Sequence, residues 1–328
     1  MLWGQAVSQK LPRNFFRAAV DSKLVDRICR SAPCPFRRDE PLALRTTFRI
    51  GGSAALFAEP CSAADLLKLY HIVRTEQVSY FHLGLGSNIL ISDDGFNGIV
   101  IKSGGELNRI EQSKTILTAG PGARLLDLTA SAALCGLSGI EALSGIPGSV
   151  GGGLYMNAGA YGMEISDTLI ELDILTRDNR IETLCRDDIH FGYRSAPELQ
   201  DAIVLESRYR LTVGDRASVF REMRRVWKLR RAKQPLEYPS AGSVFKRPPN
   251  DFAGRLIEAV GGKGLTIGGA MVSLKHAGFI VNMGNAKASD VCALVKEIRR
   301  RVYEKFHVLL EPEIKTVGFN GDPFEIAI

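Results

Sequence analysis

The chain has few cysteines and no long apolar run, and each absence excludes a class of protein. Its six cysteines include no C-x-x-C pair and no metal-ligand spacing, which predicts reduced thiols rather than a disulfide framework or a zinc site. No apolar run approaches the roughly 18 residues that span a bilayer, so we expect no membrane segment. The five histidines do not cluster, which argues against a metal centre or a catalytic triad.

The N-terminal stretch also lacks the unbroken apolar segment of a secretory signal. Asn14, Arg17, Asp21 and Lys23 interrupt it. We therefore expect a cytoplasmic protein in which residues 1–38 form a basic extension.

Acidic residues are outnumbered, at 36 against 42 Lys and Arg, which gives a formal net charge of +6. Clustered basic residues can bind nucleic acid. The densest cluster, residues 221–233, contains apolar side chains at helical spacing. We interpret Asp215 to Ala232 as an amphipathic helix with most cations in solvent, some of which could also hold an anionic small molecule. No nucleic-acid module accompanies it, so we expect no nucleic-acid partner.

The order of strand-like and helix-like segments predicts three α+β units. Helical periodicity covers Ala63 to Thr75, Leu125 to Leu134 with Gly136 as its stop, and Asp290 to Phe306. On the strand after residue 169, Ile170, Leu172 and Ile174 are expected to share one face. The expected boundaries are residues 39–104, 105–214 and 215–318, followed by a tail over residues 319–328.

Two glycine-rich loops indicate a ligand with phosphate groups. Gly84 to Asn88 follows a predicted strand, where backbone N–H groups can turn toward a pyrophosphate, although a tight turn explains this loop equally well. Gly145 to Gly153 removes side chains along one path, which suits close approach of backbone to a ligand. Neither loop is a G-x-G-x-x-G fingerprint or a Walker loop. Between Pro239 and Pro248, Ser243 lies beside a glycine with Lys246 three residues on, a setting that suits a proton donor.

These motifs resemble the UDP-N-acetylenolpyruvoylglucosamine reductase (UDP-N-acetylmuramate dehydrogenase) family over roughly residues 40 to 318. The resemblance rests on several independent stretches. In chain order they are Thr46 to Gly52, Gly84 to Asn88, Gly145 to Gly152, Met156 to Gly162, Tyr193 to Ser195, Pro239 to Lys246 and Glu311 to Lys315.

The resemblance implies a two-part FAD-binding domain of the vanillyl-alcohol-oxidase (PCMH) type and a C-terminal α+β substrate-binding domain. It implies that NADPH, through non-covalent FAD, reduces UDP-N-acetylglucosamine enolpyruvate to UDP-N-acetylmuramate for peptidoglycan. The family match assigns cofactor binding to Arg49, Gly84, Leu85, Gly86, Ser87, Asn88, Gly145, Ile146, Pro147, Gly148, Ser149, Gly151, Gly152, Asn157 and Gly159, and substrate binding to Lys246, Lys275 and His276. A structural role for His276 is an equal alternative.

The same match implies three catalytic residues. Ser243 is the general acid, and Arg194 stabilises negative charge that develops on the substrate. Glu313 would orient the enolate in its protonated form, which requires that burial raise its pKa. Strand alternation would direct Glu311 to the same side, so Glu311 is the alternative carboxylate.

The chain departs from the family pattern at two points. The serine expected two positions after Arg194 is replaced by Ala196, with Ser195 one position early. Only 49 residues separate Arg194 from Ser243, which resembles the shorter type II form without the tyrosine-bearing loop over the substrate. Two alternative functions stay open: another FAD-dependent oxidase or dehydrogenase of the same fold, and a non-catalytic sugar-nucleotide-binding protein.

Overall fold

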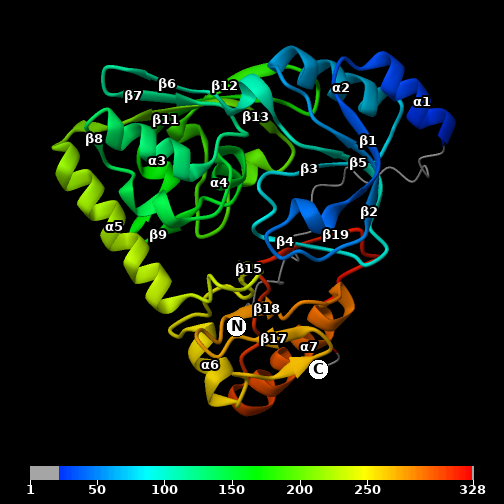
Figure 1. Cartoon of the computed structure of the whole chain (residues 1–328), viewed down its shortest axis with the longest axis vertical. Helices are drawn as coiled ribbons and strands as arrows, with labels where there is room; N and C mark the ends of the chain where they lie inside the picture. The colour runs from blue at the N-terminus through cyan, green and yellow to red at the C-terminus, as the bar shows by residue number, and fades with distance from the viewer. Residues whose placement is uncertain (1–21, 327–328) are drawn as a thin grey trace, which may run out of the picture.

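The computed structural model describes residues 22–326, which fold into three α+β units that meet at a common junction (Figure 1). The first unit is a four-stranded sheet in the order β1-β2-β5-β3, antiparallel between β1 and β2 and parallel elsewhere. Its helices lie together at one end of Figure 1. The elements are α1 (Ser22–Ser31), β1 (Phe36–Pro41), β2 (Ser53–Ala58), α2 (Ala63–Thr75), β3 (Tyr80–His82), β4 (Ile89–Ile91) and β5 (Phe96–Ile101).

Both helices of the first unit follow from local sequence. The prediction for α2 is confirmed at both ends, and Ser62 caps it by accepting a hydrogen bond from the backbone N–H of Asp65 at 3.1 Å. In α1, Leu24 and Ile28 are buried in the same core as α2. The described part of the basic extension is therefore packed on the first unit, whereas residues 1–21 lie outside the described residues.

The second unit is a five-stranded antiparallel sheet in the order β12-β11-β13-β7-β6. The prediction of a helix over Leu125–Leu134 is confirmed, and Gly136 follows it with φ of +67°. The elements are β6 (Ile110–Ser113), β7 (Ile116–Ala119), α3 (Leu125–Leu134), β8 (Leu137–Ser138), α4 (Val150–Tyr155), β9 (Gly159–Ala160), β10 (Met163–Glu164), β11 (Leu169–Leu175), β12 (Ile181–Cys185), β13 (Ile203–Arg210) and β14 (Thr212–Val213).

The predicted apolar face of β11 is wrong at one residue. Leu172 and Ile174 are buried in the core of the second unit, but Leu169 joins them in place of Ile170. The ladder between β11 and β13 shifts register between Leu169 and Glu171. Because such an irregularity adds a residue to one strand, the alternation of side chains changes sides there.

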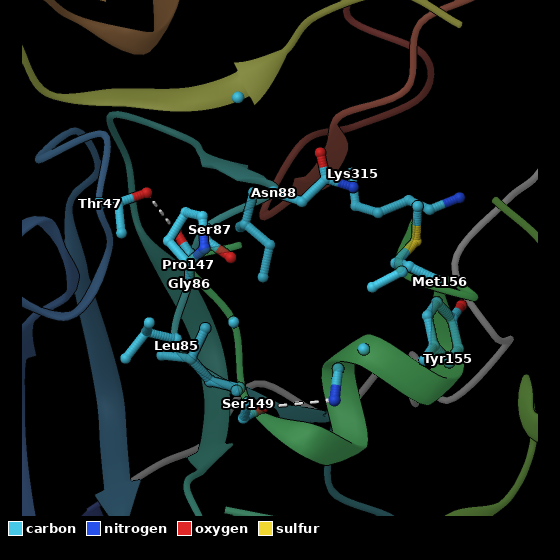
Figure 2. Close-up of a pocket in the computed structure, with 18 of the residues that line it drawn as sticks. Thr47, Leu85, Gly86, Ser87, Asn88, Pro147, Ser149, Tyr155, Met156 and Lys315 are labelled. Atoms are coloured by element: carbon cyan, nitrogen blue, oxygen red, sulfur yellow. Dashed lines mark hydrogen bonds between the residues drawn. The ribbon is translucent and has the colours of Figure 1, made fainter. Parts of the chain in front are cut away.

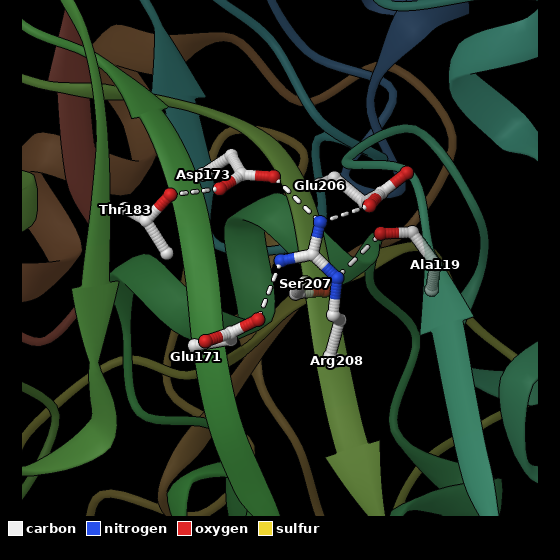
Figure 3. Close-up of polar contacts among 7 residues, drawn as sticks. All are labelled: Ala119, Glu171, Asp173, Thr183, Glu206, Ser207 and Arg208. Carbon is white, nitrogen blue, oxygen red and sulfur yellow. Dashed lines mark hydrogen bonds and ion pairs between the residues drawn. The ribbon is translucent and has the colours of Figure 1, made fainter.

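An arginine with several carboxylate partners joins the strands of this sheet (Figure 3). Arg208 on β13 donates to Glu171 at 2.9 Å and to Asp173 at 2.8 Å, both on β11, and to Glu206 at 2.6 Å. Thr183 on β12 donates to Asp173 at 2.6 Å. The cluster therefore ties three adjacent strands together, although its partial exposure to solvent limits its contribution to stability.

The third unit contains the sheet β15-β18-β17-β16 and the helices α6 and α7. The predicted apolar stripe of α7 is confirmed, because Val291, Leu294, Val295, Ile298 and Val302 are all buried. Helix α5 runs from the second unit to the third (Figure 1). The elements are α5 (Arg216–Lys233), β15 (Ser240–Ser243), α6 (Ala253–Ala259), β16 (Thr266–Ile267), β17 (Ala270–Val272), β18 (Phe279–Asn282), α7 (Ala288–Phe306) and β19 (Lys315–Val317).

The final strand returns the chain to the first unit. Strand β19 pairs in parallel with β4, and the register matches Lys315 with Ile89 and Val317 with Ile91. Just before β19, the backbone N–H of Glu313 donates to the carbonyl of Val244 at 2.7 Å. The segment before and within β19 is thus held by both the third and the first unit.

Membrane-spanning helices, metal-binding clusters and disulfides are all absent from residues 22–326. No helix within residues 22–326 is long and apolar enough to cross a membrane. In the same range no group of three or more His, Cys, Asp or Glu side chains is arranged to hold a metal ion. All six cysteine thiols are free.

Asn282 at the end of β18 fastens the third unit to the first. Its side-chain amide is buried and donates to the carbonyls of Phe48 at 3.1 Å and Arg49 at 3.3 Å. The amide oxygen accepts from the backbone N–H groups of Gly284 at 2.8 Å and Ala286 at 3.1 Å. One side chain therefore satisfies four backbone groups across two units.

We predict that Asn282→Ala lowers the free energy of unfolding by roughly 1–3 kcal/mol, because buried backbone groups lose their partners. The exposed Asn285 is a matched control, and Asn285→Ala should change stability by less than about 0.5 kcal/mol. Urea unfolding followed by circular dichroism measures both. Equal midpoints for the two variants would show that the Asn282 contacts do not join the units.

Candidate active site

A cavity of about 950 Å³ lies where the three units meet. This volume is at the upper end of the range of roughly 300–1,000 Å³ for small-molecule sites. Figure 2 shows the first glycine loop and Lys315 facing the α4 segment across it. The lining includes Thr47, Arg49, Gly84 to Asn88, Ile146 to Ser149, Gly151 to Gly153, Tyr155, Met156, Gly159, Arg194, Arg230, Ser240 to Ser243, Glu313 and Lys315.

The first glycine loop presents unused hydrogen-bond donors. Gly86 has φ of +67°, and its carbonyl accepts from the backbone N–H of Thr47 at 3.1 Å. The Thr47 hydroxyl also donates to the carbonyl of Ser240 at 2.7 Å, which links this loop to β15. The backbone N–H groups of residues 84–87 donate no hydrogen bond within the described part of the chain. These N–H groups can donate to an acceptor in the cavity, such as a pyrophosphate group.

The second loop packs directly on the first. Ser149 caps α4 by accepting from the backbone N–H of Gly152 at 3.3 Å (Figure 2). A Cβ atom at Gly84 would overlap the Ser149 hydroxyl, so residue 84 has no room for a side chain. Gly151 also lies close to the segment that contains Pro121, because a Cβ atom at residue 151 would be 3.0 Å from the Pro121 side chain. These contacts explain the glycines as close backbone approaches beside the cavity.

Two of the residues assigned to the cofactor lie behind the cavity wall. Gly145 does not line the cavity, and a Cβ on it would overlap the side chain of Arg230. Asn157 is fully buried and donates to Glu164 at 2.6 Å and to the carbonyl of Gly192 at 3.1 Å. Both residues therefore support other parts of the site instead of facing the cavity.

A tight turn presents Arg194 to the cavity. Gly192 and Ser195 exchange backbone hydrogen bonds of 2.9 and 3.1 Å, and Arg194 between them has φ of +56°. Its Nε donates to the Glu313 carboxylate at 2.8 Å, and a terminal nitrogen donates to the Gly159 carbonyl at 3.4 Å. Residues 119 positions apart in the chain thus form a largely buried ion pair.

Burial controls the protonation of Glu313. Desolvation raises the pKa of Glu313, although Arg194 lowers it and Lys246 and Lys315 lower it further. Glu311 differs, because its side chain is largely exposed and it accepts from Lys246 at 2.5 Å. Only Glu313 lines the cavity, so burial separates the two carboxylates that strand alternation left equivalent.

Ser243 ends β15 and lines the same cavity as Arg194 and Glu313. No hydrogen bond of its hydroxyl is found within residues 22–326, so the hydroxyl can turn toward a ligand. Ala196, at the position of the missing serine, is buried in the core of the second unit. It adds no polar group to the site.

Lys246, Lys275 and His276 do not line the cavity. Lys275 lies 3.6 Å from the Glu237 carboxylate. His276 Nδ1 accepts from the backbone N–H of Gly278 at 3.0 Å, and its ring packs edge-on against Phe279. This geometry favours the structural alternative for His276.

Several residues that line the cavity had no individual role predicted from the sequence. Arg230 belongs to the basic helix, for which most cations were expected in solvent and some at an anionic small molecule; it is only 8% exposed and lines the cavity. Burial lowers the pKa of Lys315, raises that of Tyr155 to about 12 and lowers that of His82 to about 4. Lys315 ends the Glu-Pro-Glu-Ile-Lys motif, which was the signal available for it. For Arg230 the signal was its place in the basic helix, some of whose cations were expected to hold an anionic small molecule.

Two family models match the chain, and one of them identifies its general class. The FAD binding domain matches residues 54–184, which identifies a flavin-binding protein and confirms that part of the predicted fold. The C-terminal domain of UDP-N-acetylenolpyruvoylglucosamine reductase matches residues 234–317. Together they confirm the predicted FAD-binding portion followed by a C-terminal α+β domain.

Individual relatives extend the match over most of the chain. The UDP-N-acetylenolpyruvoylglucosamine reductase of Agathobacter rectalis is 45% identical over 295 residues, which cover 86% of this chain and 93% of the relative. That of Latilactobacillus sakei is 44% identical over 283 residues, with 86% and 93% covered. The crystal structure of the enzyme (MurB) from Thermus caldophilus superposes with a TM-score of 0.75 at 36% identity, over 87% of this chain and 99% of the other. The chain belongs to the UDP-N-acetylenolpyruvoylglucosamine reductase family.

We predict that Gly84→Ala weakens FAD binding by at least about 10-fold, because the new methyl group overlaps the Ser149 hydroxyl and separates the loops. Adding Ser149→Ala should restore most of the affinity, since the next atom of Ser149 is 3.6 Å from the added Cβ. Ser149→Ala alone removes the N-cap of α4 and should lower the free energy of unfolding by about 1 kcal/mol. FAD titration by fluorescence quenching measures all three variants. Additive effects of the two changes would contradict the proposed contact between the loops.

Proposed function

We propose that this protein catalyses the NADPH-dependent, FAD-mediated reduction of UDP-N-acetylglucosamine enolpyruvate to UDP-N-acetylmuramate, a step of peptidoglycan precursor synthesis. The observation that carries the proposal is the convergence of Ser243, Arg194 and Glu313 on a cavity walled by two glycine loops. The names of the relatives, at 44–45% identity, support the same reaction.

FAD is the cofactor, and the residues present fit it. The N–H groups of residues 84–87, which have no acceptor in the described chain, suit a pyrophosphate. The loop from Ile146 to Gly153 lines the cavity and has few side chains, so a planar ring system can lie against its backbone. We propose that binding is non-covalent. When bound, the flavin accepts hydride from NADPH and delivers it to the β-carbon of the enolpyruvyl group.

Arg194 stabilises charge in this reaction. Hydride addition at the β-carbon places negative charge on the α-carbon and its carboxylate, and a fixed guanidinium in a desolvated cavity favours that distribution. The tight turn from Gly192 to Ser195 and the bond to Glu313 hold Arg194 in place before substrate arrives. The guanidinium group is therefore already oriented when substrate binds, and the reaction step needs no further loss of its conformational freedom.

Ser243 delivers the proton that completes the reduction at the α-carbon. Its hydroxyl has no competing partner in the described chain, and the cation Lys315 also lines the cavity. Lys246, which the family match assigns to the substrate, lies outside the lining and is engaged by Glu311. We therefore propose that Lys246 acts on the site through its charge, while Lys315 is nearer to the reacting groups.

Glu313 acts in its protonated form. Burial raises its pKa, and a neutral carboxyl can donate a hydrogen bond to an enolate oxygen where a carboxylate would repel it. Arg194 opposes this shift, so the pair balances one fixed cation against one group that can hold a proton.

The substrate is a sugar nucleotide, as the family implies. We propose that the enzyme works in the cytoplasm, where nucleotide sugars and NADPH are available, and that it binds no nucleic acid. Two exposed cations of α5 have ion-pair partners, which supports this reading: Arg225 pairs with Glu222 at 2.6 Å, and Arg221 lies 3.8 Å from Asp215.

We predict that Ser243→Ala leaves reduction of the flavin by NADPH nearly unchanged but slows its reoxidation by substrate by about 10²- to 10⁴-fold, because only the second step needs the proton. Ser243→Cys should recover part of the rate, since a thiol also donates a proton. Stopped-flow absorbance at the flavin band separates the two steps. The exposed Ser289→Ala in α7 is the control. Slower reduction by NADPH with normal reoxidation would make Ser243 a nicotinamide-positioning residue.

A further inference from the structure

Arg230 is a buried cation that no ion pair within residues 22–326 compensates. It lies on α5, whose other cations are mostly exposed, yet it is only 8% exposed itself. Its Nε is buried and has no hydrogen-bond partner, and no carboxylate within residues 22–326 forms an ion pair with it. A buried charge in this condition costs several kcal/mol. The protein keeps such a group only where something else compensates the charge.

The surroundings of Arg230 direct it into the active site. Its side chain crosses Gly145, where a Cβ atom would overlap it, and it lines the cavity. The titratable groups that act on Arg230 electrostatically are Tyr161 and Arg194. Arg194 is already engaged by Glu313, and within residues 22–326 neither that carboxyl group nor another forms an ion pair with Arg230. The missing anion must come from a ligand.

We propose that Arg230 is an anion-binding residue of the reaction site, which holds negative charge at the junction of the second glycine loop with the Arg194–Glu313 pair. This inference rests on the proposed function. The charge has three sources in that reaction: the pyrimidine end of the flavin, which becomes negative on reduction, the enolpyruvyl carboxylate, and the substrate diphosphate. All three are planar or branched oxyanions that suit a guanidinium fork.

The flavin is tested first, without turnover. The lone pair of sulfite forms a bond to the N5 atom of oxidised flavin, and the resulting negative charge spreads to the pyrimidine end. If Arg230 faces that end, Arg230→Met and Arg230→Gln raise the Kd of the sulfite adduct by about 10-fold or more, read from the loss of flavin absorbance. Arg230→Lys, which keeps the charge but loses the fork, should lie between them and the wild type.

The substrate groups are tested by equilibrium binding to the oxidised holoenzyme. UDP-N-acetylmuramate carries a lactyl carboxylate that UDP-N-acetylglucosamine lacks, while both carry the diphosphate. A loss of about 10- to 100-fold for UDP-N-acetylmuramate alone assigns Arg230 to the carboxylate, and an equal loss for both assigns it to the diphosphate. Either result supports anion binding.

The exposed Arg231, which lies over the Trp227 ring at 5.4 Å, provides the control, and Arg231→Met should leave sulfite and product binding within twofold of wild type. Circular dichroism and FAD content verify that each variant is folded and loaded. Unchanged affinity for sulfite and for both UDP-sugars in Arg230→Met and Arg230→Gln would overturn the proposal. A wild type that binds no FAD and turns over no substrate would instead reject the proposed function itself.

Discussion

The ion pair between Arg194 and Glu313 is the contact on which the organisation of the site depends. Arg194 donates to the Glu313 carboxyl group whether that group is ionised or protonated, and in the ionised form each buried charge compensates the other. Arg194 comes from a turn of the second unit and Glu313 from the C-terminal segment. The pair therefore forms only when the second unit and the C-terminal segment are assembled around the cavity.

The backbone holds both partners from outside the cavity. Glu313 is fixed between Val244 of the third unit and the parallel pairing of β19 with β4, while Asn88 donates to its carbonyl at 3.3 Å. Arg194 is fixed by its turn, whose Gly192 carbonyl is held by the buried Asn157. Val244 and Asn157, which do not line the cavity, thus help to determine where its charges lie. In the proposed mechanism, flavin binding and charge stabilisation therefore depend on the same backbone contacts, which limits reorganisation during the reaction.

The sequence predicted what depends on local rules. Helices α2 and α3 were predicted at their observed ends from helical periodicity, with Gly136 as the stop of α3, and motif context singled out Arg194 and Glu313, which form the ion pair. Contacts between distant segments were not predictable. Gly145 is small because Arg230 crosses it, and Arg230 is buried because of how α5 lies on the second unit, so helical periodicity could not show which cation of this helix is buried. A shift in the β11–β13 ladder likewise exchanged Ile170 for Leu169 in the core.

The protonation of Glu313 tests this account most directly, because the burial that surrounds the contact with Arg194 must also let the carboxyl group keep its proton. Infrared difference spectroscopy across a pH titration, with Glu313→Gln subtracted, isolates its carbonyl band. Since the folded pKa is raised, the protonated band should persist above the ordinary value for glutamate, about 4.3, and Arg194→Met should move its loss to still higher pH. A band that disappears at or below that value, or that does not respond to Arg194→Met, would contradict the account.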